Sequence, residues 1–207
     1  MTTAARSIAG CASSHKYWGS HGLLWELATA GDGLRSSPEA PYRPHEYSIR
    51  RCPVPPVTSI RQANLTDADA IAALVNEAYT PYIARIGKQP APMLDDYRQV
   101  ISEAEVYVLT QEEAVVGVLV MSQEGRELLL VNVAVLPRCK GQGLGKVLMQ
   151  YCEDHARRAQ CTAIRLYTHE LMTENIAIYK KLGYQETRRA TENGFARVFM
   201  HKALPEG

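Results

Sequence analysis

Residues 133–146 read VAVLPRCKGQGLGK, and this short stretch carries most of the information about the architecture. A long apolar run, Glu127–Val135, passes into a loop with glycines at 141, 143 and 145, after which an amphipathic helix begins. Glycines let backbone N–H groups approach an oxyanion closely, and the start of a helix adds partial positive charge. Arg138, Lys140 and Lys146 add full charges. We therefore expect a cradle for a multiply charged anion such as a pyrophosphate.

Two common phosphate-binding loops do not match this stretch. A Walker A loop needs Gly-Lys followed by Ser or Thr, whereas Gly145-Lys146 is followed by Val147. A dinucleotide fingerprint needs GxGxxG after the first strand of a parallel unit. Here the spacing is GxGxG, deep in the chain and after strands that read as an antiparallel meander. On this segment alone, a second interpretation stays open: the glycines serve only to begin the helix and bind no anion.

Composition excludes several classes of protein. With 207 residues, 46% of them hydrophobic and 22% charged, the chain predicts one globular domain plus an extension. A net charge of +1 argues against a nucleic-acid partner, and no apolar run reaches the roughly 18 residues of a membrane-spanning helix. Five scattered cysteines without a CxxC pair favour a reducing, cytoplasmic setting. Six histidines without an HxxxH pair predict no metal site.

The first 56 residues differ from the rest. Gly, Ser, Pro, His and Arg are scattered through them, and they end in prolines at 53, 55 and 56, which stop helices and strands. We predict a disordered or loosely packed extension at 1–56, with one short amphipathic helix at Gly22–Ala30. The absence of acidic residues among the first 25 leaves an organelle transit peptide as an alternative. The domain is expected at 57–204, with a tail at 205–207.

From residue 57 onward the hydrophobic periodicity becomes regular. The residues Thr80–Met93 are marked by prolines and predict a loop, and Asn193-Gly194 predicts a hairpin turn. The order of elements gives an α/β (α+β) domain, a mixed sheet with helices on both faces. The expected helices are Asp67–Tyr79, Leu94–Ser102, Gly143–Gln160 and Thr173–Leu182, and the expected strands are Val57–Gln62, Glu105–Gln111, Val115–Gln123, Glu127–Val135, Ala163–Thr168, Tyr184–Thr191 and Phe195–Lys202.

Two motifs resemble the GNAT N-acetyltransferase family. Pro137–Gly145 is similar to that family's pyrophosphate-binding motif Q/R-x-x-G-x-G/A, with Lys140 where Gln or Arg is usual. The frame that begins at Arg138 also satisfies the formula, so the register stays open. Ile178–Tyr184 resembles the family's ending Y-x-K-L-G-F/Y. Together the motifs and the strand order cover roughly residues 57–204.

The resemblance implies a GNAT fold, a mostly antiparallel mixed sheet of about six to seven strands splayed between the fourth and fifth. It implies acetyl-coenzyme A as the cofactor, with pantetheine beside the backbone of Val133 and Val135 and the Val135 N–H on the thioester carbonyl. The family often has Asn seven positions before its tyrosine, where this chain has Met172; Asn175 lies closer. The implied cofactor-binding residues are Val133, Ala134, Val135, Arg138, Lys140, Gly141, Gln142, Gly143, Leu144, Gly145, Lys146, Asn175 and Tyr179.

The same resemblance implies roles in catalysis. Tyr179 is the expected general acid that protonates the coenzyme A thiolate; the alternative is a core aromatic on a helix. A base is needed because an alkylammonium is not nucleophilic. Some relatives carry a glutamate within the fourth strand, but Leu128–Val135 contains none, so Glu127 and His169 are the candidates, with Glu170 beside His169. For His169 a solvated loop position is the alternative.

The acceptor is expected to be an amine of a small molecule or peptide, bound near the first helices. Tyr82, Arg85 and Asn132 are the substrate candidates, with Asp95 and Asp96 as further charges that would suit an ammonium. A solvated face is the alternative for the charged residues, and a local backbone contact for Asn132. A GNAT-fold module that binds acyl-coenzyme A without catalysis is the alternative function, and a homodimer is left open.

Overall fold

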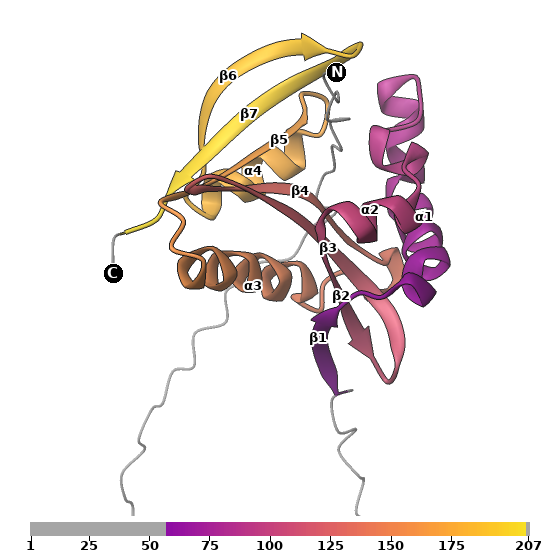
Figure 1. Ribbon diagram of the computed structural model, residues 1–207. Coiled ribbons are helices and arrows are strands. Elements are labelled where there is room, and N and C mark those ends of the chain that lie inside the picture. Colours follow the sequence, from indigo (N-terminus) through magenta and orange to yellow (C-terminus); the bar gives the residue numbers. More distant parts are fainter. Residues whose placement is uncertain (1–56, 206–207) are drawn as a thin grey trace, which may run out of the picture. The chain divides into compact units, whose positions relative to one another are not determined.

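The computed structural model describes residues 57–205; the predicted extension 1–56 with its helix at 22–30, and residues 206–207, lie outside the described residues. Seven strands form one sheet in the order β1-β2-β3-β4-β5-β7-β6 (Figure 1). All neighbours are antiparallel except β4 and β5. The strands are β1 (Thr58–Gln62), β2 (Glu105–Gln111), β3 (Ala114–Glu124), β4 (Glu127–Val135), β5 (Ala163–His169), β6 (Gln185–Glu192) and β7 (Phe195–Ala203).

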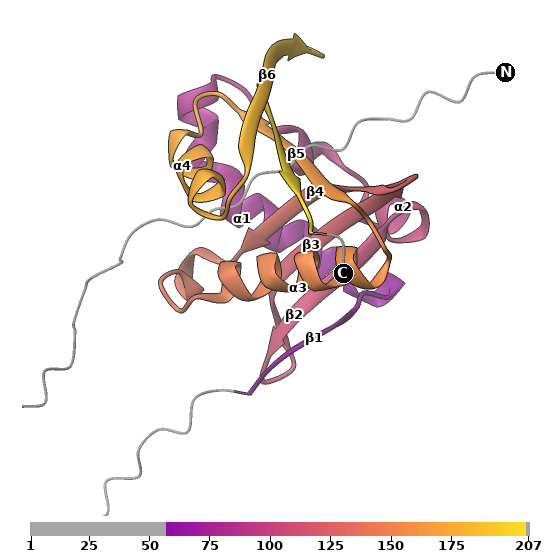
Figure 2. The same cartoon turned by 90° about the vertical axis from the view of Figure 1, so that its left-hand side faces the viewer.

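Helices cover both faces of this sheet, as the periodicity predicted. Helices α1 (Ala68–Ile86) and α2 (Tyr97–Glu103) lie on one face, and α3 (Leu144–Arg158) and α4 (Thr173–Lys181) lie on the other (Figure 2). The expected mixed sheet with helices on both faces is thereby confirmed. No helix within residues 57–205 combines the length and apolarity needed to cross a membrane.

The apolar run Glu127–Val135 forms the central strand β4, buried over nearly its whole length. Its pairing with β5 runs from Glu127–Ala163 to Leu130–Leu166 and stops there, so the carboxyl ends of the two strands separate. On its other side Val120 pairs with Asn132 and Met121 with Leu130, which leaves Val131 as a bulge. A bulge bends and twists the bulged strand. The predicted splay between the fourth and fifth strands is therefore confirmed, and a bulge lies at the residue where the splay begins.

Helix α1 is longer than the sequence predicted. The expected end was Tyr79, but the helix continues through Pro81 to Ile86, so the loop predicted at Thr80–Met93 shrinks to the residues after Ile86. Proline costs a helix one backbone hydrogen bond. The side chains of Tyr79 and Tyr82 are buried when the helix continues, and this apolar burial offsets the cost. Helix α2 begins later than predicted, at Tyr97 rather than Leu94. Asp96 caps it by accepting a hydrogen bond from the Arg98 N–H at 2.9 Å.

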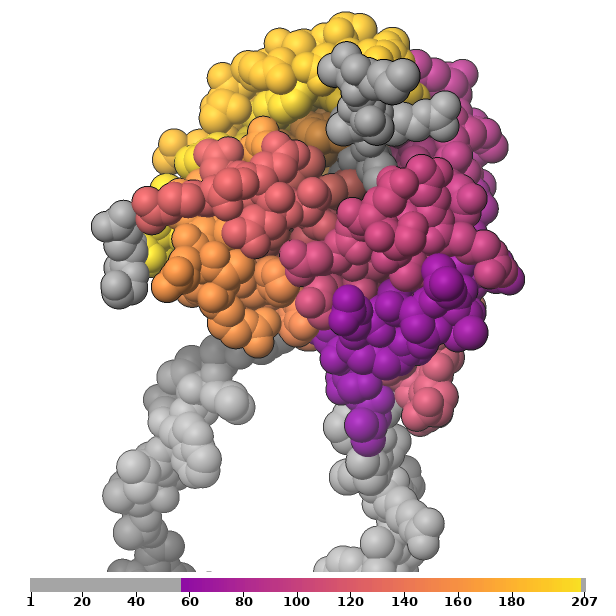
Figure 3. All heavy atoms as spheres, viewed as in Figure 1, coloured from indigo at the N-terminus to yellow at the C-terminus, as the bar shows by residue number. Residues whose placement is uncertain are grey.

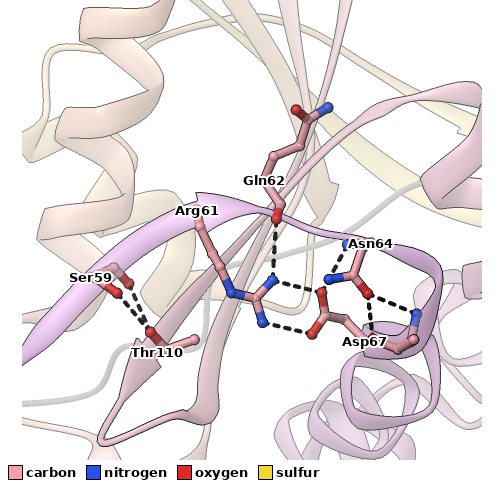
Figure 4. A network of polar contacts seen from close by, with 7 residues as sticks. Ser59, Arg61, Gln62, Asn64, Asp67 and Thr110 are labelled. Carbon is pink, nitrogen blue, oxygen red and sulfur yellow. Dashed lines mark hydrogen bonds and ion pairs between the residues drawn. The ribbon is translucent and has the colours of Figure 1, made fainter.

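The start of α1 is held by a polar network at the end of β1 (Figure 4). Asp67 accepts two bonds from the Arg61 guanidinium, at 2.7 and 2.8 Å, and a third from the Asn64 N–H at 2.8 Å. Asn64 in turn accepts from the Thr66 N–H at 2.9 Å, which completes a capping box. The bond to Arg61 is the main cause that lowers the pKa of Asp67. This network fixes the direction in which α1 leaves the sheet.

Helix α3 packs closely on β3. Its buried face includes Leu148, Met149 and Ala156, whereas Val147 is 45% exposed. The helix approaches the sheet at Gly117, where an added Cβ would lie 3.1 Å from a Leu148 methyl group and 3.4 Å from the Ala134 carbonyl oxygen. The second turn of α3 is thereby held against β3, the neighbour of the strand that precedes the glycine-rich loop.

Candidate active site

Two residues of β4, Val133 and Val135, direct their backbone N–H and C=O groups toward the splay. The Leu136 N–H donates to the Val116 carbonyl of β3 at 2.9 Å. Backbone groups alternate sides along a strand, so Ala134 also faces β3, whereas Val133 and Val135 face the β5 side. That side is where the pairing with β5 has ended. The two residues expected to pair with pantetheine therefore direct their backbone groups into the gap.

The glycine-rich loop reaches α3 through two residues in the left-handed region, Gly141 (φ 82°) and Gly143 (φ 77°). Gly143 is the N-cap, and its carbonyl accepts the N–H groups of Lys146 and Val147 at 2.9 and 3.2 Å. The N–H groups of Leu144 and Gly145 precede any carbonyl that could accept them within the helix, so they face the anion-binding end. This placement favours the register that aligns Lys140 with Gly143 and Gly145.

The side chains around the loop divide into anchors and exposed charges. Cys139 and Leu144 are buried and anchor the two ends of the loop. Arg138, Gln142 and Lys146 are exposed and Lys140 is half-buried, and Gln142 also accepts a 3.3 Å bond from Gln111. An added Cβ at Gly141 or Gly143 would meet no atom within 4 Å. Open space, three cations and a helix start fit the diphosphate of coenzyme A.

Helix α4 places Asn175 and Tyr179 four residues apart on its buried face. Both are almost completely buried, and the Tyr179 ring meets Tyr184 edge-on with ring centres 5.8 Å apart. The hydroxyl of Tyr184 is buried without a hydrogen-bond partner among residues 57–205, and burial raises the pKa of Tyr184. Met172 is buried and receives a 3.7 Å contact from the Thr168 hydroxyl. The burial of Tyr179 is compatible with either of its expected roles.

A hollow lies at the carboxyl end of β5, between the end of α1 and the β6–β7 hairpin. The centres of water-sized spheres fit into about 30 Å³ of it, and the surrounding empty space of about 350 Å³ includes open solvent. Aromatic and apolar groups form most of its wall, and its polar groups are few. Its lining includes Tyr79, Pro92, Tyr167, His169, Phe195 and Arg197.

His169 lines this pocket, and its hydrogen bonding assigns its two ring nitrogens. Its Nδ1 accepts from the Leu171 N–H at 3.2 Å, so in the neutral ring the proton lies on Nε2. Burial lowers the pKa of His169, which keeps the ring neutral at pH 7. In this arrangement Nε2 donates a hydrogen bond and is not the proton acceptor that a general base requires.

Glu127 does not lie at this site, which corrects the expectation that it could serve as the base. It stands at the amino end of β4 and pairs with Arg165 at 3.3 Å and His201 at 3.9 Å. Six residues separate it from Val133, which along a strand is about 20 Å. The parallel strands bring their carboxyl ends, not their amino ends, to the splay.

The three expected substrate residues have structural partners in the fold. Asn132 is fully buried, accepts from the Tyr79 hydroxyl at 2.9 Å and donates to the Tyr97 hydroxyl at 3.1 Å. Arg85 pairs with Glu174 at 2.5 Å and also donates to the Leu171 carbonyl, which ties α1 to the segment after β5. Tyr82 is 8% exposed and packs beside Tyr79. The geometry gives Asn132 a structural role rather than contact with an acceptor.

The fold buries one carboxylate oxygen of Asp95, which the sequence around this residue does not predict. One of its carboxylate oxygens is buried without a hydrogen-bond partner among the described residues, and burial raises the pKa of Asp95 to about 6. Its charge also helps to raise the pKa of Tyr97, whose hydroxyl bonds to the carbonyl of the pocket residue Pro92 at 3.1 Å. Asp95 and Asp96 look alike in sequence; the structure separates a desolvated carboxylate from a helix cap.

Known structures share this fold. The ribosomal-protein-S18-alanine N-acetyltransferase of Escherichia coli is 20% identical, with a TM-score of 0.57 over 71% of this chain and 94% of its own. The PaiA N-acetyltransferase of Thermoplasma acidophilum, in complex with coenzyme A, is 15% identical, with a TM-score of 0.60 over 72% and 99%. The acetyltransferase YncA of Salmonella typhimurium, described as putative and solved with acetyl-CoA, is 22% identical, with a TM-score of 0.56 over 72% and 95%.

No curated protein matches the sequence, whereas a family does. The acetyltransferase (GNAT) family matches residues 69–184, which are more than half of the 207 residues. The matched range includes β4, the glycine-rich loop, α3, β5 and α4, the elements that build the splay and the helix start described above. The chain therefore belongs to the acetyltransferase (GNAT) family, and its acyl donor is acetyl-coenzyme A.

Proposed function

We propose that the protein transfers the acetyl group of acetyl-coenzyme A to the amine of a small molecule or peptide, by direct attack within a ternary complex. One observation carries this proposal. The pairing of β4 with β5 ends at Leu130–Leu166; beyond that point β4 leads into the glycine-rich start of α3, and the pocket lies at the carboxyl end of β5. A diphosphate at one end and an amine at the other would thus meet at the ends of the two strands, because the coenzyme's arm is extended.

When bound, acetyl-coenzyme A supplies an acetyl group held as a thioester. Lys140, Lys146 and the N–H groups at the start of α3 would hold the diphosphate. The N–H of Val135 would donate to the acetyl oxygen, where negative charge grows as the amine attacks. The hydroxyl of Tyr179 would give its proton to the leaving sulfur as the carbon–sulfur bond breaks and the carbon–nitrogen bond forms.

A proton must also leave the attacking amine. Glu127 lies at the opposite end of the strand, and the outward nitrogen of His169 carries a proton. Asp95 is the candidate carboxylate, because it is desolvated and ionised above about pH 6 and closely follows Pro92, which lines the pocket. We infer that Asp95 accepts the proton, directly or through one water, while His169 donates a hydrogen bond to the acceptor.

The first test measures free thiol release from acetyl-coenzyme A with a panel of small amines, amino acids, polyamines, aminoglycosides and peptide N-termini. Acetyl-coenzyme A at micromolar concentration should raise the melting temperature, whereas ATP and NAD should not. Binding without thiol release across a broad panel would instead favour a binding module. The buried thiols of Cys139, Cys152 and Cys161 support a reducing, cytoplasmic setting for the reaction.

A further inference from the structure

The pocket at the carboxyl end of β5, where we propose that the amine binds, has an unusual charge pattern for a site that receives a cation. Its lining contains one guanidinium, from Arg197, and one imidazole, from His169, but no carboxylate, since Asp95 lies outside the lining. All other lining groups are aromatic, aliphatic, hydroxyl-bearing or, in Met172, a thioether. A pocket that selects polyamines or other polycations needs negative charge, because like charges in a partly desolvated site repel. The lining instead offers hydrogen-bond donors at the edge of an apolar wall.

Arg197 is held rigidly in this wall. It is 4% exposed, its guanidinium lies 4.3 Å from the ring centre of Tyr167, and its Nη1 pairs with Glu192 at 3.1 Å. A guanidinium stays charged at every physiological pH and carries five N–H donors in a planar fork. A single carboxylate does not accept all five. A guanidinium can bind a carboxylate brought by a ligand in the same plane as a carboxylate of the protein.

A second cation lies at the rim of the pocket. Lys88 follows α1 and donates to the Gly194 carbonyl at 2.6 Å, with its ammonium 3.6 Å from the centre of the Phe195 ring. In the space-filling view the β6–β7 hairpin and the end of α1 lie next to each other (Figure 3). Lys88 thus joins the end of α1 to the β6–β7 turn and adds a second cation beside the pocket residue Phe195, whereas the charge of Arg197 is shared with Glu192.

We propose that the acceptor is a small apolar amino acid, whose carboxylate binds Arg197 and whose side chain packs on Tyr167 and Phe195. This inference rests on the proposed function and specifies its substrate class. The amine then points from the guanidinium toward the end of β5, where His169 and Thr168 lie. Polyamines and aminoglycosides carry several positive charges and no carboxylate, so they should be poor acceptors.

The experiment compares acceptors that differ by the carboxylate alone. Thiol release is measured with phenylalanine against phenethylamine, and with leucine against isopentylamine, each rate referred to the concentration of unprotonated amine. The amino acid of each pair should show a kcat/KM about tenfold to a hundredfold higher, the size expected for a charge-assisted bidentate contact. Equal or faster reaction of the decarboxylated amines overturns the inference and leaves the proposed function standing, whereas no thiol release with any amine overturns both.

Variants assign the preference to one residue. Arg197→Gln should bring the ratio within each pair close to about 1, and Arg197→Lys should keep part of it. Arg189→Gln is the matched control, because it removes one positive charge from β6, where Arg189 is exposed and pairs with Glu186. The control should leave the ratio unchanged. A preference that survives in Arg197→Gln, in protein that still shows the thermal shift with acetyl-coenzyme A, overturns the assignment; if that variant does not fold, the wild-type pairs alone decide.

Discussion

The hydroxyl of Tyr79 donates a 2.9 Å hydrogen bond to the amide oxygen of Asn132, across 53 positions of sequence. The amide nitrogen of Asn132 donates in turn to the Tyr97 hydroxyl at 3.1 Å. One buried amide therefore joins α1, β4 and α2 next to the bulge where the splay begins. Buried polar groups of this kind are costly when one partner is removed, because the others lose their bonds in a desolvated place.

Replacing Asn132 by Leu should therefore lower the free energy of unfolding by about 2–4 kcal/mol, since the hydroxyls of Tyr79 and Tyr97 each lose one hydrogen bond in a buried place. Urea denaturation measures this loss. Tyr79→Phe is the milder comparison and should cost about 1 kcal/mol. If Asn132 instead binds the acceptor, the variant keeps its stability and shows a raised KM for the amine.

Gly143→Ala should separate backbone strain from cofactor binding. Gly143 has a φ of 77°, so an alanine there costs about 1–2 kcal/mol although its Cβ meets no atom. Gly125, in the turn between β3 and β4, has a φ of 62° and equally open space. Both alanine variants should lose similar stability, and only Gly143→Ala should raise the KM for acetyl-coenzyme A. An unchanged KM in Gly143→Ala would remove the loop from the cofactor site.

Tyr179→Phe should keep acetyl-coenzyme A binding and lower kcat by about tenfold to a hundredfold, because the leaving sulfur loses its proton donor. Tyr184→Phe removes the adjacent buried hydroxyl, which has no hydrogen-bond partner among residues 57–205. That control should leave kcat unchanged, and its stability should be equal to or above that of the wild type. Equal rates for Tyr179→Phe and the wild type would leave Tyr179 as a core aromatic.

Asp95→Asn should affect stability and activity in opposite directions. The pKa of Asp95 is raised to about 6, so the folded state binds this proton more tightly than the unfolded chain. The stability linked to this proton is fully present below the unfolded pKa of about 4 and is lost as the pH rises through about 6. The variant should therefore be more stable than the wild type by about 1–2 kcal/mol at pH 8, with no difference below about pH 4.

The catalytic measurement on Asp95→Asn is the pH profile of kcat/KM. In the wild type the rate should rise as Asp95 ionises near pH 6, in addition to the ionisation of the amine, and in the variant that rise should be missing. A variant that is stabilised at pH 8 and retains the wild-type profile would exclude Asp95 as the proton acceptor. Chemical denaturation at the two pH values supplies the matching stability data.

Elements that depend on neighbouring residues were predictable from the chain alone. The bounds of β2 and β4 agree with the hydrophobic runs, and the hairpin turn is at Asn193-Gly194, as that dipeptide indicates. The splayed sheet followed from the family resemblance, and the structure confirms it. The loop at Gly141 and Gly143 also needed no tertiary information, because left-handed backbone and a helix start depend on residues a few positions apart.

Other features depended on contacts between distant segments. Pro81 marks the end of a helix by local rules, yet α1 continues because Tyr79 and Tyr82 are buried against the rest of the fold. Glu127 could be judged as a base only once parallel pairing had placed it at the far end of β4. Asp95 and Asp96 have the same local chemistry, and burial of one carboxylate alone separates them. Backbone conformation is a short-range property of the chain, whereas desolvation and charge pairing exist only after segments far apart in sequence have packed together.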